Sequence, residues 1–495
     1  MALFSRRVVA LSVVVCASTS VATAQPLNFR IETAEHSMPP LHSYGFGELG
    51  DWYFFFGGIS GQGLHSLIQG GEPGQFPPSF PVNIFNDEII AFNHETGETL
   101  TSGIDHLPTD TRLQMFVTNV PSIQFDDVVH IYGGYGPNAT DDDWETRTTV
   151  TSVNLTQLLA AMQMGQPAPM GAFVTQAATG AQVTGAIIIR MGDNGRKYAL
   201  IGGSNFIGDY AGNTPFLNLY SEKAQLFDAD VSITTPYKTL EGSTLHRRDM
   251  NALPMTYPDG QGGTMTGFAI AGGVFQNGFF IWRNPLSYRD GDKNVTDELF
   301  FEQRMNQYEA GALSFYSETD DENRQVLFGG ISESRWENDM FVSDPVVPWV
   351  TDITQIRVQG GMYLDETVIG NTPLPTTNAH TVIAEGIPTY PNGQINLDAM
   401  PANEVLIARL PGGLRAAEPA GTPMTFASGD VYEIYATYGV RGDINRDGVV
   451  NGSDLAELLA NWGSTATVPD LQFDGVINGA DLATLLALWG NDTPG

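Results

Sequence analysis

The sequence predicts a mainly β body over residues 25–440, followed by a small α-helical module over residues 442–491. Three observations support this division. Apolar segments that end in a pair of glycines recur six times in the body, and one loop–helix unit occurs twice in the module. The body is also rich in Gly, Thr, Asn, Pro and aromatic residues, and outside the stretch 155–164 it has few amphipathic helical patterns.

The first 24 residues have the pattern of a secretory signal peptide. Two arginines precede the apolar run 8–16, and residues 22–24, Ala-Thr-Ala, offer a small–x–small cleavage site. We therefore expect residues 1–24 to be removed and the protein to be secreted. Cys16 is the single cysteine of the chain. Since it lies in this segment, the mature chain has no thiol for a disulfide or a metal site.

The six double-glycine segments of the body predict strands that end in tight turns. The first glycines of successive pairs are 57 to 83 residues apart. Because glycine tolerates unusual backbone angles and lets a neighbouring chain approach closely, we place these strands at the crowded inner edge of repeated sheets. The strands and their pairs are Trp52–Phe56 with Gly57-Gly58, Val128–Tyr132 with Gly133-Gly134, Tyr198–Ile201 with Gly202-Gly203, Gly267–Ala271 with Gly272-Gly273, Gln325–Phe328 with Gly329-Gly330, and Val405–Leu410 with Gly412-Gly413.

This pattern resembles the kelch-type β-propeller, in which each repeat forms one sheet, or blade, around a central axis. The resemblance implies six blades, with seven as the alternative count. The units here exceed the roughly 50 residues of a kelch repeat, and a pair of β-sandwiches or a β-helix is the alternative architecture. Galactose oxidase also has a kelch propeller, but its cofactor needs a cysteine cross-linked to a tyrosine, which the mature chain cannot supply.

The module contains two twelve-residue loops, residues 443–454 and 470–481, with a period of 27 residues. Each loop has oxygen-bearing side chains at positions 1, 3, 5, 9 and 12, a glycine at position 6, and a free carbonyl at position 7. Ca²⁺ takes six to eight oxygens at roughly 2.3–2.6 Å, and this spacing supplies them. The ligands that we expect are Asp443, Asn445, Asp447, Val449 (carbonyl), Asn451 and Asp454, and in the second loop Asp470, Gln472, Asp474, Val476 (carbonyl), Asn478 and Asp481.

A short amphipathic helix should follow each loop. Apolar residues at i, i+3, i+4 and i+7 share one helical face, and Gly463 and Gly490 stand where a helix C-cap is expected. We expect the two helices to bury these faces against each other. Gln472 replaces the usual Asp or Asn at position 3, so the second site should be weaker. The face residues are Leu455, Leu458, Leu459 and Trp462, and then Leu482, Leu485, Leu486 and Trp489.

The tandem unit resembles a type I dockerin, which has loop–helix repeats with Asp at position 12 and no entering helix. The resemblance implies two bound Ca²⁺ ions and attachment to a partner protein, which for dockerins is a cohesin, or to another surface protein. Loop positions 10 and 11 help dockerins to choose the partner; they are Gly452-Ser453 and Gly479-Ala480 here, all small. Gly439–Gly442 is the whole linker, so the tail should stay close to the body.

Composition excludes several classes of function. With 56 acidic and 23 basic residues, the formal net charge is −33, whereas nucleic-acid binding demands a basic face. Outside the N-terminal segment, no apolar run approaches the roughly 20 residues of a membrane span. The hydrophobic share of 42% permits a large core. These features favour a protein that is secreted or attached to the cell surface.

The body has no zinc-protease, nucleophile-elbow or phosphate-loop motif, and its histidines are scattered. Its densest polar cluster is His246-Arg247-Arg248-Asp249. We interpret this cluster as a candidate anion- or sugar-binding group near the propeller axis. The alternative is a salt bridge between blades. Catalytic residues of a glycosidase are unknown from sequence, because the separation of two carboxylates that matters is spatial.

Two hypotheses of function follow. In the first, a non-enzymatic β-propeller binding domain is anchored to a partner by a calcium-dependent tail. In the second, the body is a polysaccharide hydrolase or lyase with its site at the propeller axis. The absence of a catalytic motif favours the first hypothesis, and the enzymes that dockerins often carry keep the second open. Paired carboxylates, or an acid with arginines, at the axis would favour the enzyme, and a hydrophobic axis would count against it.

Overall fold

The structure is a computed structural model, and it describes most of the chain. The predicted signal peptide, residues 1–24, lies outside the described residues. The described residues are 25–61, 82–138, 143–208, 216–276, 280–344, 348–373, 376–377, 379–417, 425–466, 468–472 and 475–491.

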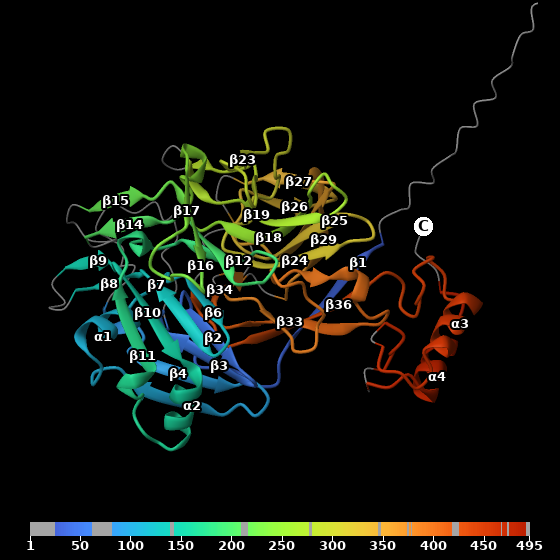
Figure 1. The fold of residues 1–495 in the computed structure, drawn as a ribbon, viewed down its shortest axis with the longest axis horizontal. Coiled ribbons are helices and arrows are strands. Elements are labelled where there is room, and N and C mark those ends of the chain that lie inside the picture. Colours follow the sequence, from blue (N-terminus) through green and yellow to red (C-terminus); the bar gives the residue numbers. More distant parts are fainter. Residues whose placement is uncertain are drawn as a thin grey trace, which may run out of the picture.

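The body is mainly β, and its main sheets are antiparallel meanders that follow one another along the chain (Figure 1). The first sheet contains β2 (Gly45–Leu49), β3 (Trp52–Phe56), β4 (Glu88–Asn93) and β5 (Thr99–Gly103). The second contains β6 (Ser122–Phe125), β7 (Val128–Tyr132), β10 (Thr149–Asn154) and β11 (Phe173–Ala177). The third contains β12 (Ile187–Met191), β13 (Lys197–Ile201), β16 (Lys223–Asp228) and β17 (Lys238–Glu241).

The next three main sheets repeat this plan with two additions. In the fifth sheet a short strand pairs in parallel with the first strand, and in the sixth the N-terminal strand adds to the outer edge. The fourth sheet contains β18 (Asn251–Pro258), β19 (Thr264–Ala271), β22 (Leu286–Arg289) and β23 (Thr296–Asp297); the fifth β24 (Gly311–Ser317), β25 (Glu322–Phe328), β28 (Asp352–Gln359), β29 (Met362–Asn371) and β32 (Ile395–Asn396); the sixth β31 (Val382–Ile383), β33 (Val405–Pro411), β36 (Val431–Tyr438) and β1 (Leu27–Thr33).

The first strands of successive main sheets contact one another, β2 with β6, β6 with β12, β12 with β18, and β18 with β24. Just before these strands, backbone hydrogen bonds of 2.9–3.2 Å pass from sheet to sheet. Asn119 N donates to Ser43 O, Gly185 N to Asn119 O, Asp249 N to Gly185 O, and Glu309 N to Asp249 O. All five residues have positive φ. Sheets joined edge to edge in this way are consistent with a β-propeller-like body.

All six predicted double-glycine segments are strands, but their predicted place in the sheet is wrong. They form β3, β7 and β13, and parts of β19, β25 and β33, each the second strand of its sheet instead of the innermost. The glycines are needed where one sheet meets the next. A Cβ on Gly57 would lie 2.4 Å from Val117 O, in the loop that leads to the second sheet. A Cβ on Gly412, directly after β33 of the sixth sheet, would lie 2.8 Å from Leu41 O, which precedes β2, so the end of the last sheet contacts the start of the first.

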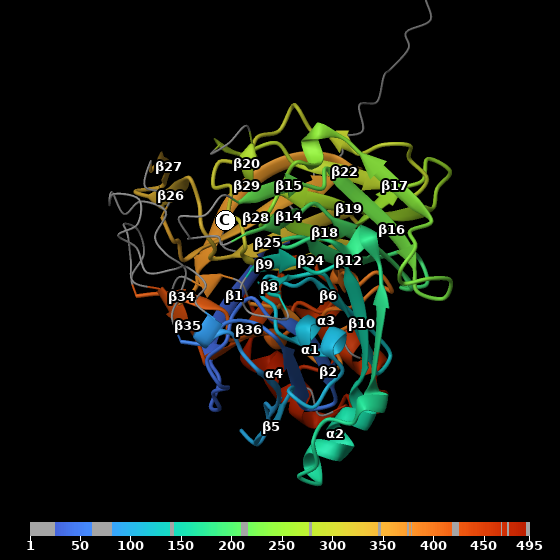
Figure 2. The same ribbon diagram turned by 90° about the vertical axis from the view of Figure 1, so that its left-hand side faces the viewer.

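Smaller elements connect or flank these sheets, and Figure 2 shows several of them beside the main strands. The predicted helical stretch 155–164 is confirmed as α2 (Leu155–Gln163), whereas α1 (Thr109–Met115) has no apolar stripe and was missed. The other small elements are β8 (Tyr135–Pro137), β9 (Trp144–Thr146), β14 (Ser204–Ile207), β15 (Leu217–Tyr220), β20 (Val274–Gln276), β21 (Phe280–Ile281), β26 (Ser334–Glu337), β27 (Met340–Ser343), β30 (Thr376–Thr377), β34 (Leu414–Ala416), β35 (Thr425–Ala427), and the 3₁₀ turns at Val82–Ile84, Met170–Ala172, Thr179–Ala181, Ser243–Leu245 and Leu397–Ala399.

The tail follows β36 directly and consists of two loops, each leading into a helix, α3 (Gly452–Ala460) and α4 (Gly479–Ala487). Figure 1 shows both helices at one side of the body, beyond β36. Within the described residues, no helix has the length and apolarity that crossing a bilayer requires.

Candidate metal centre and axial cavity

The acidic residue at position 12 organises each loop of the tail. Asp454 is fully buried, and its Oδ1 accepts from Ile444 N at 2.7 Å and from Asn445 N at 3.1 Å. Its Oδ2 accepts from Asn451 N at 2.7 Å, which forms a capping box with the N-cap of α3. Asp481 repeats the arrangement at α4. The shorter Asp suffices at position 12 because it is also the third residue of the helix.

The acidic residue at position 1 is buried inside the turn of each loop. Asp443 is 2% exposed; its Oδ1 accepts from Asp447 N at 3.1 Å and its Oδ2 from Gly448 N at 2.7 Å. Burial raises the pKa of Asp443, and the nearby carboxylates of Asp454 and Asp447 raise it further, against the hydrogen bonds from the backbone. A bound cation would remove that repulsion, because it would draw these carboxylates together in their charged form.

Amide side chains at positions 3 and 9 complete the first loop. Asn445 Nδ2 donates to Asp447 Oδ2 at 3.0 Å, and Asn451 Nδ2 donates to Val449 O at 3.0 Å. The hydrogen bond from Asn445 is the main cause that lowers the pKa of Asp447, which is exposed. Since an amide can present its oxygen by rotating its terminal torsion, these residues are able to serve as ligands.

A different observation indicates that the second loop can hold a cation. Asp470 is 6% exposed; its Oδ2 accepts from Gly475 N at 2.9 Å, whereas its buried Oδ1 has no hydrogen-bond partner in the structure. A buried carboxylate oxygen without a partner is costly, and a Ca²⁺ ion would satisfy it. Gln472 Nε2 donates to Thr484 Oγ1 on α4. The predicted ligand Asp474 lies outside the described residues.

Carboxylates alone do not make these sites. Among the side chains that the structure describes, His, Asp and Glu form no group of three or more that could hold a metal. A Ca²⁺ ion in the first loop, whose residues are all described, would therefore depend on amide and carbonyl oxygens as well. In both loops the position-7 carbonyl, Val449 O or Val476 O, accepts from the position-9 amide nitrogen at 2.9–3.0 Å. Hydrogen bonds thus connect the predicted ligands of the first loop to one another within a single loop of the chain.

The prediction that the two helices bury their whole apolar faces against each other is wrong. Leu458 and Leu485 are fully buried, and Leu455 and Leu482 are partly buried. The core of the tail is completed by loop residues and by Ala402 of the body. The residues at i+4 and i+7 of both helices point to solvent, with exposed fractions of 47–54%: Leu459, Trp462, Leu486 and Trp489.

The two repeats are joined by equivalent backbone hydrogen bonds. Gly463 N donates to Ile477 O and Gly490 N to Val450 O, both at 2.8 Å. Both glycines have positive φ and lie three residues after the last helical residue, so they do not occupy the predicted C-cap position itself. Val450 and Ile477 hold the same place in their loops, so each repeat ends against the loop of the other.

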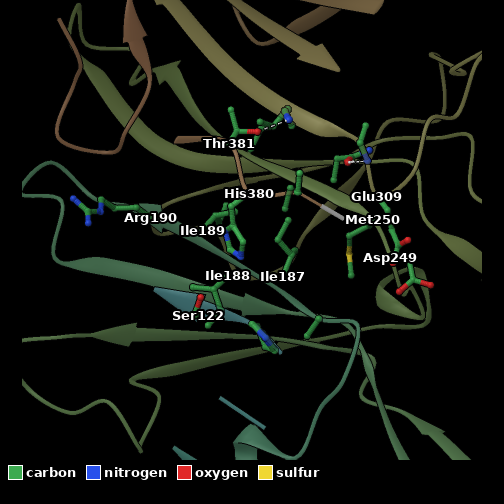
Figure 3. A pocket seen from close by; sticks show the side chains of 18 of the residues that line it. Ser122, Ile187, Ile188, Ile189, Arg190, Asp249, Met250, Glu309, His380 and Thr381 are labelled. Carbon is green, nitrogen blue, oxygen red and sulfur yellow. Dashed lines mark hydrogen bonds between the residues drawn. The ribbon is translucent and has the colours of Figure 1, made fainter. Parts of the chain in front are cut away.

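A cavity of about 380 Å³ lies where the first strands of the main sheets meet. Aliphatic side chains, among them Ile187, Ile188, Ile189 and Met250, share its wall with polar and charged groups. Figure 3 shows Asp249 and Glu309 at one side of the cavity and Arg190 at the other, with His380 between them. Arg190 Nη2 donates to Gln124 O at 2.6 Å, and His380 is partly buried, with a pKa lowered to about 4 by loss of solvent.

The four residues of the predicted polar cluster lie in different surroundings. Asp249 lines the cavity, and Arg248 Nε lies 3.1 Å from its Oδ2. His246 stacks on the Tyr220 ring at 3.9 Å, and its Nδ1 lies 2.7 Å from a Glu222 oxygen. The side chains of the cluster therefore do not converge on one site in this structure.

Arg247 is fully buried and bonded to the backbone. Its guanidinium donates to Thr244 O, Gly272 O and Asn284 O at 2.8–2.9 Å and stacks on Trp282 at 4.5 Å. Burial lowers its pKa to about 9. All three acceptors are backbone carbonyls, so Arg247 holds the surrounding loops in place.

Sequence reasoning missed the residues that join the tail to the body. Arg446, at position 4 of the first loop, donates to Met400 O at 2.9 Å, and Asn403 Nδ2 donates to Leu471 O in the second loop at 2.6 Å. The sequence held one signal, an arginine inside a loop of acidic and amide residues, but it gave no indication of the partner.

Residues 441–487 match the family model of the dockerin type I domain. Type I dockerin domains bind Ca²⁺ and attach to cohesin domains, and they occur in extracellular cellulosome-type proteins. No curated protein matches the chain. A solved structure titled "Structure of YjhT" is 12% identical over 81% of this chain and 96% of that chain, with a TM-score of 0.44. A likeness this low establishes no shared fold, and the functional account rests on the dockerin match and the geometry of the site.

Proposed function

We propose that this protein is secreted, binds two Ca²⁺ ions in its tail, and uses the tail to attach a six-bladed kelch-like β-propeller to a cohesin-like or other surface protein. The observation that carries the proposal is an exposed apolar pair at the end of each helix. Leu459 on α3 and Trp462, two residues after α3, correspond to Leu486 on α4 and Trp489, two residues after α4, at the same places in the 27-residue repeat. Exposed leucine and tryptophan on a small module favour a protein–protein contact.

The blade count is supported by the continuity of the main sheets. Six sheets follow one another along the chain. Gly412, after β33 of the sixth sheet, approaches Leu41 in front of the first, as Gly57, after β3 of the first sheet, approaches Val117 in front of the second. Gly58 N and Gly413 N donate to these same two carbonyls, Val117 O and Leu41 O, at 2.7 and 2.9 Å. The same contact at both ends of the series favours a closed ring of six.

Immobilised type I cohesin domains test the attachment. The full chain should bind in CaCl₂ and dissociate when EGTA is added, because loops that lose the cation lose the order of both helices. Trp462→Ala combined with Trp489→Ala should weaken binding by at least about 10-fold, whereas Trp144→Ala in the body should leave it unchanged. Binding that survives EGTA, or that ignores both tail tryptophans, would contradict the proposed role of the tail.

Secretion has its own test. Export should leave a mature chain that begins at Gln25. Mass spectrometry of the exported protein should find this N-terminus, and a mature protein that retains residues 1–24 would contradict the proposed signal peptide.

The second candidate function is a carbohydrate-active enzyme with its site in the axial cavity. The favouring observation is that two acidic residues, Asp249 and Glu309, line the same side of that cavity; the isoleucines and Met250 in its wall count against it. Incubation with a polysaccharide panel should then release products, and Asp249→Asn or Glu309→Gln should reduce the rate by 100-fold or more, roughly the contribution of an acid–base group. A panel without product would leave the propeller as a binding domain, and polysaccharide binding without cleavage would support that role.

A further inference from the structure

Arg446 links the first calcium loop to the body. Its Nη2 donates to Met400 O at 2.9 Å, its Cζ lies 5.0 Å from the centre of the Tyr438 ring, and its Nη1 lies 3.9 Å from Asp398 Oδ1. Its own carbonyl accepts from Gln25 Nε2 at 3.1 Å. Arg446 has φ of 59°, a left-handed angle that the turn of the loop imposes. The shape of the loop therefore decides whether this side chain reaches the body.

The second loop is held by the neighbouring segment of the body. Asn403, 6% exposed, donates from Nδ2 to Leu471 O at 2.6 Å, and Gly442 N donates to Ala402 O at 2.7 Å. Ala402 is buried in the same apolar core as Ile444 and Leu471, one residue from each loop. The body thus contributes to the core of the tail and bonds to both loops.

These contacts fall where the first and last strands of the body meet. β1 pairs with β36 from Leu27↔Tyr438 onward, and Gly439 N donates to Pro26 O at 2.8 Å. Arg324 Nη1 donates to Gln25 O at 2.7 Å, and its Cζ lies 5.2 Å from the Tyr438 ring. The Tyr438 ring at the end of β36 therefore contacts a guanidinium of the body and one of the tail, and Gln25, two residues before β1, is bonded to the same two arginines.

We propose that the calcium loops form a latch on the β1–β36 strand pair, with Arg446 and Asn403 as positioning residues, so that Ca²⁺ stabilises the body as well as the tail. The latch rests on the proposed binding of Ca²⁺ by these loops. Without a cation the carboxylates of a loop repel one another and its shape is lost. A ligand that binds only the ordered loop lowers the population of the open form about 100-fold when its concentration is 100 times Kd, and this coupling is reciprocal.

Hydrogen–deuterium exchange of the full chain, read by mass spectrometry in CaCl₂ and in EGTA, tests the latch. Ca²⁺ should slow exchange in peptides that cover the two loops and also, by about 10-fold or more, in peptides that cover β1 and β36. The second main sheet, far from the tail in sequence, should be unaffected and serves as reference. Arg446→Ala should keep the response of the second loop and lose that of β1 and β36. Arg441→Ala, which removes an exposed arginine at the same junction, should behave as the wild type.

Each outcome is decisive. Loops that respond while β1 and β36 do not would overturn the latch and leave the calcium sites standing. Loops that do not respond would overturn calcium binding and the latch with it. A full response of β1 and β36 in Arg446→Ala would show that Arg446 does not couple the first loop to these strands. If that variant fails to fold, Asn403→Ala replaces it with the same expected loss, and the wild-type comparison stands by itself.

Discussion

Substitution of Gly57 by alanine tests how closely neighbouring sheets of the body approach. Gly57 has φ of +61°, and a Cβ there would lie 2.4 Å from Val117 O. That carbonyl also accepts from Gly58 N at 2.7 Å, so it is held in place. The left-handed angle costs an alanine about 1–2 kcal/mol, and the overlap with a fixed backbone atom adds about 1–3 kcal/mol. Gly57→Ala should therefore lower the free energy of unfolding of the body by roughly 2–5 kcal/mol.

Gly260→Ala is the matched control. Gly260 has φ of +74°, but no atom lies within 4 Å of a Cβ placed there, so the substitution should cost only the about 1–2 kcal/mol of the backbone angle. Urea denaturation followed by near-ultraviolet circular dichroism measures both variants. Equal losses in the two variants would refute the contact between sheets as the reason for the glycine.

Three further predictions concern the tail, a partly buried acid and a buried arginine. Asp447→Ala combined with Asp474→Ala should lower the helicity of the tail as EGTA does, and unchanged circular dichroism at 222 nm in both experiments would contradict the coupling of metal and fold. Burial raises the pKa of Glu366 from 4.5 to about 7, although two backbone N–H groups of segment 304–305 donate to it. The folded state then holds this proton more tightly than the unfolded state, so stability should fall as pH rises from 4.5 to 7; Glu366→Gln should flatten that fall in urea melts, and an unaltered slope would exclude Glu366. Arg247→Met leaves three carbonyls unpaired and should cost roughly 3 kcal/mol or more, measured by calorimetric melting; a loss below 0.5 kcal/mol, about that of an ordinary surface change, would contradict its structural role.

Local signals in the sequence identified the strands and the loops. The double glycines marked six strands because each pair is confined to one short segment, and the loop spacing marked the candidate metal sites because all expected ligands of a loop lie within twelve residues. The innermost strands gave weaker signals. β6 and β31 are only four and two residues long, and their burial comes from neighbouring sheets instead of from their own pattern.

Features made by residues distant in sequence could not be predicted. β14 pairs with β9 through Ile207 and Glu145, which are joined only by the fold. Helical periodicity identified which residues of α3 share a face, but not how much of that face is covered, so Leu459 was predicted buried and is 51% exposed. Arg446 donates a hydrogen bond to Met400 O, 46 residues away in the sequence. Charge and spacing in the sequence give no information about a contact at that separation.

Isothermal titration of the full chain with CaCl₂, after removal of metal with EGTA and exchange into metal-free buffer, measures calcium binding by the two loops. We expect uptake of two Ca²⁺ ions per chain, with the site that contains Gln472 the weaker, and uptake of one ion when Asp443 is replaced by alanine. A titration without Ca²⁺ uptake would contradict the calcium sites, and with them the attachment role of the tail and the latch on β1 and β36.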